Sequence, residues 1–431
     1  MGSRRSFLRQ LTHSAGVFSF MGLTNTVLAA EARRQQQRFH SLSDAEALQD
    51  EEFWSWVRLQ FTTSPNLLNL NNGGVSPQPK PVQEAHIRFY QYANEAPTYY
   101  MWRILDEGRE ALRGRLARLA GCDAEELAIN RNATEGLNTV IFGLDLKPGD
   151  EVVLSRQDYP NMINAWKQRE KRDGIKLVWI NLNLPEDNEE VLVQQYTAAF
   201  TNRTKVVHVT HLINWTGQLL PIRRIADAAR KRGIQVIGDG AHVFAHFDVA
   251  IPELGCDYYA TSLHKWLCAP FGSGLLWIRK EKIKDVWALL SNDKPDGSDI
   301  RKFESLGTRS FASEIAIGNA IDFHEAIGSK RKEERLRFLT NYWTGRVRDV
   351  KGVRFLHPAK EHLYGAIGNI AMEQMKPAEL ASALHSRFKI HTVAIDWENI
   401  HGVRMTPHVY TSTADLDRLV TALRTLAQEK K

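Results

Sequence analysis

The sequence predicts an α/β protein with a mostly parallel central sheet in a large domain and a smaller α/β domain at the C-terminus. Two observations predict this fold class. Between residues 151 and 278, short β-branched or apolar runs alternate with amphipathic stretches, and strands separated by such helices form parallel, buried sheets. After about Arg301 a long helical tract and isolated strands replace this alternation. A chain of 431 residues has room for more than one hydrophobic core.

The central strands are predicted from their composition and length. They span Glu151–Leu154, Lys176–Ile180, Lys205–Thr210, Gln235–Gly238, Tyr258–Thr261 and Gly274–Ile278. Amphipathic helices between several of them span Asn161–Arg172, Asn188–Phe200 and Arg223–Arg232. The last two strands have no helix between them, so we expect one edge of the sheet to be antiparallel.

The flanking regions are predicted to contain a short helix at Asp44–Gln60, a helical tract at Ser313–Val350 and strands at Gly365–Met372 and Val403–Thr406. We therefore divide the chain into a leader at 1–32, an N-terminal segment at 33–75, a large cofactor-binding domain at 76–300 and a small domain at 301–431.

Composition excludes several classes of protein. The chain is 43% apolar and 25% charged, which is typical of a globular enzyme. The formal charge of +6 is spread along the chain, whereas a nucleic-acid binder would concentrate it on one element. The three cysteines do not suggest a disulfide framework or a Cys-rich metal site. No HExxH motif supports metal catalysis, and no GxxxxGK[ST] or GxGxxG motif supports nucleotide binding.

The first residues have the parts of an export signal in the right order. Ser3-Arg4-Arg5-Ser6-Phe7-Leu8 is similar to the twin-arginine class of bacterial signals, and an uncharged stretch and Ala30-Glu31-Ala32 follow it. The stretch is too weakly apolar for a stable membrane span. We expect a partnership with the twin-arginine export machinery and a periplasmic or exported protein, rather than a disordered N-terminus with two accidental arginines. Because this route carries folded proteins, we expect any cofactor to be loaded in the cytoplasm.

Lys265 is a candidate nucleophile. It lies in Thr261-Ser262-Leu263-His264-Lys265-Trp266, after an apolar strand and before a segment rich in small residues. A buried amine is less readily protonated and can form an imine with a carbonyl group. By itself this segment does not overturn the default interpretation of a surface lysine in a loop.

Asp239 is a candidate partner for a cationic ring. It ends the strand in Gln235-Val236-Ile237-Gly238-Asp239, and ligand-binding residues occur at the ends of such strands. A carboxylate there can hold a proton on a pyridine nitrogen, which a pyridoxal phosphate enzyme needs if its ring is to accept electrons. The alternative is an Asp that caps the next segment.

A candidate phosphate site lies in Asn132-Ala133-Thr134-Glu135-Gly136, where a strand gives way to a helix. Free backbone N–H groups at a helix start bind phosphate well. The same residues are also ordinary material for a helix N-cap.

These segments and four others occur in an order and spacing that resemble the class V aminotransferase family of fold-type I pyridoxal phosphate enzymes, in its isopenicillin N epimerase-like branch. The resemblance runs from about Asn69 to the end of the chain. It is carried by LNNGGVSPQP from Leu70, NATEGLN from Asn132, HLINWTGQLLPI from His211, VIGDGAH from Val236, SLHKWLCAPFGSG from Ser262, SLGTRS from Ser305 and VRMTPHVYTS from Val403.

The resemblance implies roles toward pyridoxal 5'-phosphate. Lys265 would form the internal aldimine, Asp239 would pair with the ring nitrogen, and His242 would lie near the ring oxygen. The phosphate would be bound by residues from two segments, namely Ala133, Thr134, Ser262 and His264.

Further implied roles concern the substrate and a second subunit. Tyr159 would stack on the ring, unless it is a strand-end tyrosine in the core. Asn214 and Arg404 would hold a substrate carboxylate, which suits a planar guanidinium. Thr308 would bind the phosphate of the neighbouring subunit, which implies a homodimer with shared sites. Asn72-Gly73-Gly74 would form a tight turn near the substrate.

The expected function is action at Cα of an amino acid as an aminotransferase or epimerase. A lyase, either kynureninase-like or cleaving C–S bonds, stays open, as does a non-catalytic binding protein on the same fold. The desulfurase route of the family needs a nucleophilic cysteine well downstream of the lysine. No cysteine follows Cys268, so this route is disfavoured.

Overall fold

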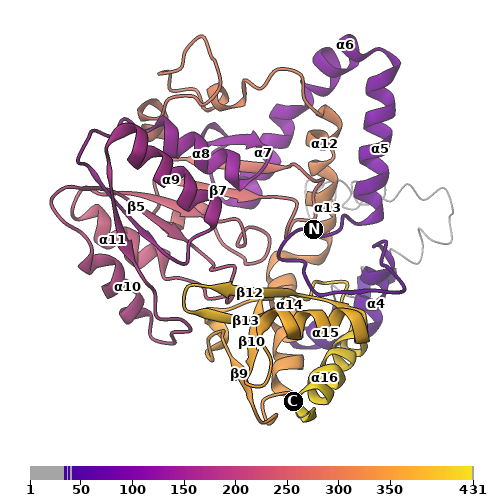
Figure 1. The fold of residues 1–431 in the computed structure, drawn as a ribbon. Helices are drawn as coiled ribbons and strands as arrows, with labels where there is room; N and C mark the ends of the chain where they lie inside the picture. Colours follow the sequence, from indigo (N-terminus) through magenta and orange to yellow (C-terminus); the bar gives the residue numbers. More distant parts are fainter. Residues whose placement is uncertain (1–33, 36, 39–40, 430–431) are drawn as a thin grey trace, which may run out of the picture.

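The computed structural model describes residues 34–35, 37–38 and 41–429 (Figure 1). The predicted leader at 1–32 lies outside the described residues, so the twin-arginine signal stays a prediction. Within the described part of the chain, no helix combines the length and apolar character needed to cross a bilayer. The predicted domain limits likewise stay predictions.

Within the described residues, seven strands form the central sheet in the order β2-β8-β7-β6-β5-β3-β4. They are β2 Leu127–Asn130, β3 Glu151–Ser155, β4 Lys176–Ile180, β5 Thr204–Thr210, β6 Gln235–Asp239, β7 Tyr258–Ser262 and β8 Gly274–Ile278. Strands β4, β3, β5, β6 and β7 are parallel, and β8 is antiparallel to both β7 and β2. The mostly parallel sheet is confirmed, but its antiparallel strand lies one position inside the edge because β2 pairs with the outer side of β8.

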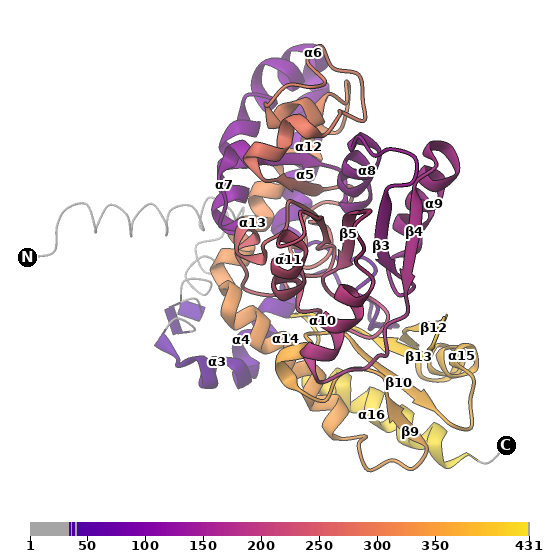
Figure 2. The same cartoon turned by 90° about the vertical axis from the view of Figure 1, so that its left-hand side faces the viewer.

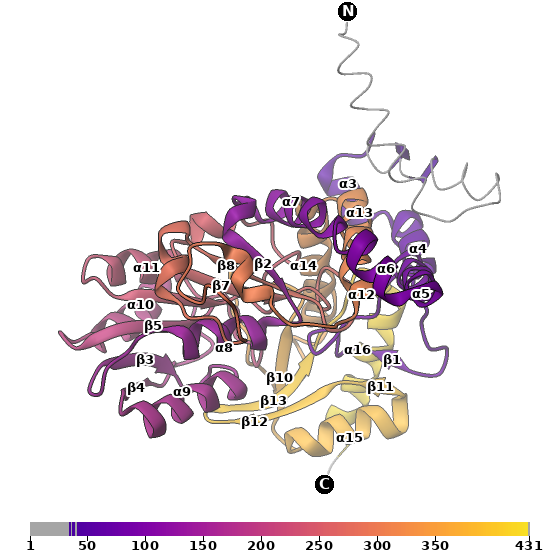
Figure 3. The ribbon, with the colours of Figure 1, turned by 90° about the horizontal axis from the view of Figure 1, so that it is seen from above.

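Helices cover both faces of this sheet (Figure 3). One face packs on α8 Ala133–Gly143 and α9 Pro160–Asp173. The other packs on α7 Gly108–Ala120, α10 Glu189–Ala198 and α11 Ile222–Arg230. Burial on both faces explains why these strands are almost continuously apolar.

A second sheet has the antiparallel order β12-β13-β10-β9 and lies below the first in Figure 1. Its strands are β9 Val353–Phe355, β10 Gly368–Met372, β12 Val393–Trp397 and β13 Ile400–Met405. One face packs on α14 Ser329–Gly345, α15 Pro377–Phe388 and α16 Thr413–Gln428. The other face packs on the large-sheet side of the molecule through Leu356, Ile395 and Ile400, which contact Leu184 and Trp215.

Two predicted helices are interrupted in the structure. The helix predicted at 44–60 is divided into α3 Asp44–Gln49 and α4 Glu51–Leu59, because the Asp50 side chain caps the second helix by accepting from the N–H groups of Glu52 and Phe53. The tract predicted at 313–350 is divided into α12 Phe311–Ile315, α13 Ile317–Ile327 and α14, with Gly328 at φ 93° before α14.

The remaining elements connect these parts. α5 Lys80–Glu95, α6 Pro97–Tyr99 and the π-helical η1 Tyr100–Leu105 lie beside α12 and α13 (Figures 1 and 2). Strand β1 Leu68–Asn69 pairs in parallel with β11 Ile390–His391 and so joins the N-terminal segment to the C-terminal region. Short 3-10 helices are η2 Ala124–Glu126, η3 Ile251–Leu254, η4 Lys280–Asp285, η5 Ile300–Glu304 and η6 Glu361–Leu363.

The strand directions bring several polar residues to one edge of the large sheet. Asn130, Thr210, Asp239 and Ser262 end β2, β5, β6 and β7, which all run the same way. In open α/β sheets this carboxyl edge is where ligands bind.

Candidate active site

A cavity of about 430 Å³ lies at this edge of the large sheet. All the predicted site residues except Thr308 line it. They are Ala133, Thr134, Tyr159, Asn214, Asp239, His242, Ser262, His264, Lys265 and Arg404. Residues that lie up to about 270 positions apart in the chain therefore share one cavity, with β13 of the second sheet supplying Arg404. Their individual roles stay predictions.

Lys265 lies directly after β7, and its Nζ lies 3.0 Å from Nε2 of His242. Burial lowers the pKa of the Lys265 amine to about 8; the Asp239 carboxylate opposes this shift and the Arg404 cation adds to it. A substantial fraction of the amine is therefore unprotonated in weakly alkaline solution, where it can act as a nucleophile or a base.

Asp239 ends β6 and is buried, and its Oδ1 accepts a hydrogen bond of 3.0 Å from the N–H of Ala241. Burial raises the pKa of this carboxyl group, while nearby His208 and Lys265 lower it. An ionised carboxylate at such a place needs a cationic partner, and a protonated ring nitrogen would supply one.

His242 is buried beside Lys265, and its Nδ1 has no hydrogen-bond partner among the described residues. Burial lowers its pKa well below the usual value, and the Lys265 cation adds to this effect. The imidazole is therefore neutral at pH 7. When Lys265 carries a proton it donates to Nε2, which leaves the imidazole proton on Nδ1.

The start of α8 supplies an anion site. Asn132 caps this helix by accepting from the N–H of Glu135 at 2.8 Å, and the N–H of Ala133 donates to Ser262 Oγ at 3.0 Å. Thr134 also lines the cavity at this helix end. First-turn N–H groups and the positive end of the helix dipole favour a bound phosphate here.

His264 lies two residues after Ser262 and also lines the cavity. It is half-buried, and its Nδ1 lies 3.1 Å from the carbonyl oxygen of Ser273. Burial, together with the Lys265 cation, lowers its pKa. Because a carbonyl oxygen only accepts, the single ring proton of a neutral His264 lies on Nδ1, and Nε2 is left as an acceptor.

Arg404 is a buried cation without an acidic partner among the described residues. Its Nη1 donates to the carbonyl oxygen of Asn214 and its Nη2 to Oδ1 of Asn71, both at 2.9 Å. Its Nε has no hydrogen-bond partner among the described residues. Burial lowers its pKa to about 10, so Arg404 stays charged at pH 7. This arrangement suits a carboxylate ligand.

Tyr159 and Thr308 occupy different surroundings. Tyr159 precedes α9 and lines the cavity with 40% of its surface exposed, so it is not the core tyrosine considered as the alternative. Thr308 is exposed in the loop between η5 and α12 and does not line this cavity. Gly73 and Gly74 of the predicted turn line it, whereas Asn72 is buried and does not.

Sequence reasoning missed several residues that support the site. Thr210 ends β5 next to Asp239 and donates to Asp158 Oδ1 at 2.7 Å, and its position at the end of a predicted strand could have identified it. Asn71 accepts a hydrogen bond from Arg404. No local sequence pattern indicates this contact, because 333 positions separate the two residues. Trp215 lines the cavity beside Asn214 and could have been found from that neighbour.

Pyridoxal 5'-phosphate fits this set of groups. The α8 start suits its phosphate, Asp239 its ring nitrogen, Lys265 its aldehyde and the unpartnered Nδ1 of His242 its ring oxygen. The unpartnered Nε of Arg404 leaves a donor for the carboxylate of an amino acid. Among the described residues that line the cavity, the two buried nitrogens left without a partner, His242 Nδ1 and Arg404 Nε, thus each have a counterpart in the cofactor or substrate.

Comparisons with known proteins agree with this arrangement. The family model described as Aminotransferase class-V matches residues 68–419. The isopenicillin N epimerase of Streptomyces clavuligerus is 30% identical over 87% of this chain and 99% of that protein. A probable cysteine desulfurase of Halalkalibacterium halodurans is 25% identical over 83% of this chain and 92% of that protein.

Among solved structures, a C-DES variant with glycine covalently linked to its PLP cofactor is similar in fold. Its TM-score is 0.76 at 21% identity, and the similarity covers 86% of this chain and 99% of that one. The predicted fold type I architecture is therefore confirmed, and pyridoxal 5'-phosphate is the cofactor. The chain belongs to the class V aminotransferase family, in its isopenicillin N epimerase-like branch.

Proposed function

We propose that this enzyme acts at Cα of an amino acid, as an aminotransferase or an epimerase. The observation that carries the proposal is that Lys265, Asp239 and Arg404 line one cavity. Each of the three charged groups matches a different need: a nucleophilic amine, an anion for a cationic ring and a cation for a carboxylate. A primary amine that carries a carboxylate is the substrate class that this set fits.

The bound cofactor supplies a protonated ring that can delocalise negative charge from Cα. The residues of the chain provide the rest. Asp239 would hold the proton on the ring nitrogen, and the α8 start would hold the phosphate. Arg404 binds the substrate carboxylate and so fixes the orientation of Cα, while the amine of Lys265 removes the Cα proton.

The fate of that proton decides the reaction. Return of the proton to Cα from the opposite face would invert the centre. In an aminotransferase the proton would not return to Cα, the amino group would remain with the cofactor, and water would supply the oxygen of the released oxo acid. The isopenicillin N epimerase relative supports including epimerisation.

A C–S lyase is the second candidate, because the relatives include probable cysteine desulfurases and the similar structures include a cystine C-S lyase. The three cysteines of the chain do not line the cavity. Cys268 is buried with its Sγ 3.5 Å from Nε2 of His408, and burial raises its pKa to about 11. A route that needs a cysteine thiolate from the same chain in the cavity is therefore disfavoured.

Incubation with single amino acids in deuterated water separates these reactions. Isopenicillin N and cystine belong in the same panel because of the relatives' names. Deuterium at Cα with inversion indicates an epimerase, a pyridoxamine spectrum indicates an aminotransferase, and pyruvate with a released sulfur species indicates a lyase. The proposal fails if the lyase products alone appear.

We also propose that the enzyme is a homodimer with shared sites. Large apolar side chains are exposed along α5, α6 and η1, where a partner can cover them. They are Ile87, Tyr90, Tyr99, Trp102 and Ile104. Thr308 is exposed in the loop next to α12, which packs on the same helices. Light scattering of the purified protein tests the dimer.

Export by the twin-arginine machinery stays part of the proposal, on the strength of the Arg4-Arg5 pair and the segment that follows it. Fusion of residues 1–32 to a reporter that is active after folded export tests it. Replacement of both arginines by lysine should abolish reporter activity in the periplasm.

A further inference from the structure

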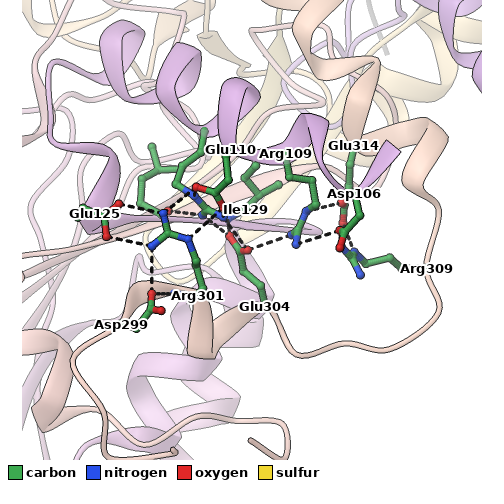
Figure 4. Close-up of polar contacts among 12 residues, drawn as sticks. Asp106, Arg109, Glu110, Glu125, Ile129, Asp299, Arg301, Glu304, Arg309 and Glu314 are labelled. Carbon is green, nitrogen blue, oxygen red and sulfur yellow. Dashed lines mark hydrogen bonds and ion pairs between the residues drawn. The ribbon is translucent and has the colours of Figure 1, made fainter. Parts of the chain in front are cut away.

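The loop that carries Thr308 is held at both ends by buried ion pairs (Figure 4). It runs from Glu304, the last residue of η5, to Arg309, just before α12. Between them, Gly307 adopts φ 76° and Thr308 is exposed. A short exposed turn thus lies between two anchored residues.

Glu304 is the first anchor. Arg113, which is 1% exposed, donates to both carboxylate oxygens of Glu304 at 2.5 and 2.9 Å. Arg109 pairs with the same carboxylate at 3.1 Å, and the backbone N–H of Ile129 donates to it at 2.6 Å. These contacts fix the end of η5 to α7 and to the edge strand β2.

Arg309 is the second anchor. Its Nε donates to Glu314 at 2.7 Å and its Nη2 to Asp106 at 3.0 Å. Its guanidinium lies 4.2 Å from the ring centroid of Phe311. Arg109 also pairs with Glu314 at 2.9 Å, so a single arginine of α7 joins the two anchors (Figure 4).

None of these charged residues lines the cavity of its own chain: Arg109, Arg113, Glu304, Arg309 and Glu314 are all outside it. Burying so many charges is costly unless all are paired, and loss of one partner leaves another charge buried and unpaired. The network therefore fixes a loop whose residues do not line the cavity of their own chain.

We propose that this network, which we name the Thr308 brace, positions Thr308 for the phosphate of the cofactor bound in a second copy of the chain. The inference rests on the proposed dimer with shared sites. The exposed side chains of Trp102 and Ile104 lie on η1, which packs on α12 next to the loop, so a second copy that covers them also reaches Thr308. Arg109, Arg113, Glu304, Arg309 and Glu314 are then positioning residues, because they act through Thr308.

Mixed dimers test the brace. Arg309→Met chains and Lys265→Ala chains carry different tags and are co-expressed, and the mixed dimer is isolated. One of its sites then combines Lys265 of the Arg309→Met chain with an intact loop from the partner. Cofactor affinity is read from absorbance, and borohydride reduction followed by mass spectrometry identifies the chain that carries the cofactor.

We expect the Arg309→Met homodimer to bind pyridoxal 5'-phosphate at least 10-fold more weakly than wild type. In the mixed dimer, the Arg309→Met chain should bind it with wild-type affinity. In a mixed dimer of Thr308→Val and Lys265→Ala chains, the Thr308→Val chain should likewise bind the cofactor with wild-type affinity. Arg203→Met is the matched control, because it breaks the ion pair with buried Glu151 far from the loop and should leave affinity unchanged.

Two results would overturn the inference, and they are distinguishable. If Thr308→Val is rescued by mixing and Arg309→Met is not, the brace acts within its own chain while the shared site stands. If neither is rescued although wild type binds the cofactor, the shared-site dimer itself fails. Thermal unfolding monitored by circular dichroism shows whether Arg309→Met folds. If it does not, Glu314→Gln replaces it in the same experiment.

Discussion

Nζ of Lys265 lies 3.0 Å from Nε2 of His242, so two basic groups share one short contact inside the cavity. Burial lowers the pKa of both groups, to about 8 for Lys265 and well below the usual value for His242. The shared proton therefore stays on Lys265 until the pH approaches 8. Above that pH the amine is free, and His242 remains neutral throughout.

The pH dependence of cofactor attachment follows from this contact. We expect the rate at which the apoenzyme takes up pyridoxal 5'-phosphate to rise with pH through a midpoint near 8, because the unprotonated amine is the nucleophile. Asp239→Asn should move the midpoint down, since its carboxylate opposes the lowering. Stopped-flow absorbance measures the rate. A midpoint above 10 would mean that Lys265 is not in a desolvated site.

Lys265→Ala should abolish the cofactor adduct that borohydride fixes to the chain. The matched control is Lys332→Met, because Lys332 is also buried, with a pKa lowered to about 8, but donates to the carbonyl oxygen of Trp266 outside the cavity. Mass spectrometry should find the adduct undiminished in the folded fraction of this control. An adduct that survives in Lys265→Ala would refute the assignment.

Arg404→Ala should weaken amino-acid binding by about 10- to 100-fold, because hydrogen bonds to charged groups contribute about 1.5–3 kcal/mol. Cofactor affinity should change little. Asn71→Ala should have a smaller effect of the same kind, because Asn71 Oδ1 accepts from Arg404 Nη2 and orients it. Spectral titration with an amino acid and with the cofactor measures both affinities, and equal losses would indicate a structural role for Arg404.

Gly217 lies in the segment after Asn214 and should tolerate no side chain. At φ 81° a Cβ would lie 2.2 Å from the carbonyl oxygen of Ile367, next to β10. We expect Gly217→Ala to lower the free energy of unfolding by about 3 kcal/mol, from left-handed strain and overpacking.

Gly149→Ala is the control for this change, since Gly149 has φ 89° with nothing within 4 Å of the added Cβ. Gly149→Ala adds the backbone strain alone and should lower the free energy of unfolding by about 1–2 kcal/mol. Denaturant unfolding measures both variants, and equal losses would show that Ile367 moves aside.

The large sheet was predictable because its strands are buried on both faces and are therefore almost continuously apolar. Strand β12 was not, because only Ile395 of its five residues is buried and the exposed Asp396 interrupts its short apolar run. The sequence prediction placed the antiparallel strand at the edge of the sheet because it did not include the pairing of β2 with β8, which joins residues about 150 positions apart. Such pairing leaves no local pattern in the sequence.

The cavity residues were predictable where a motif follows a strand or starts a helix, as for Asp239, Lys265 and Ala133. The contacts that orient them were not, since Arg404 of β13 meets Asn71, which follows β1 and lies 333 positions away in the chain. Burial also decides their charge, and the depth of Lys265 or Asp239 depends on the whole fold rather than on neighbours in sequence.

A crystal structure of the enzyme after cofactor binding and borohydride reduction tests the central claim most directly. We predict continuous density from Nζ of Lys265 to a pyridine ring whose nitrogen donates a hydrogen bond to the Asp239 carboxylate. The phosphate should lie at the start of α8. Density for the cofactor on another lysine, or a ring nitrogen that faces a group other than Asp239, would contradict the account.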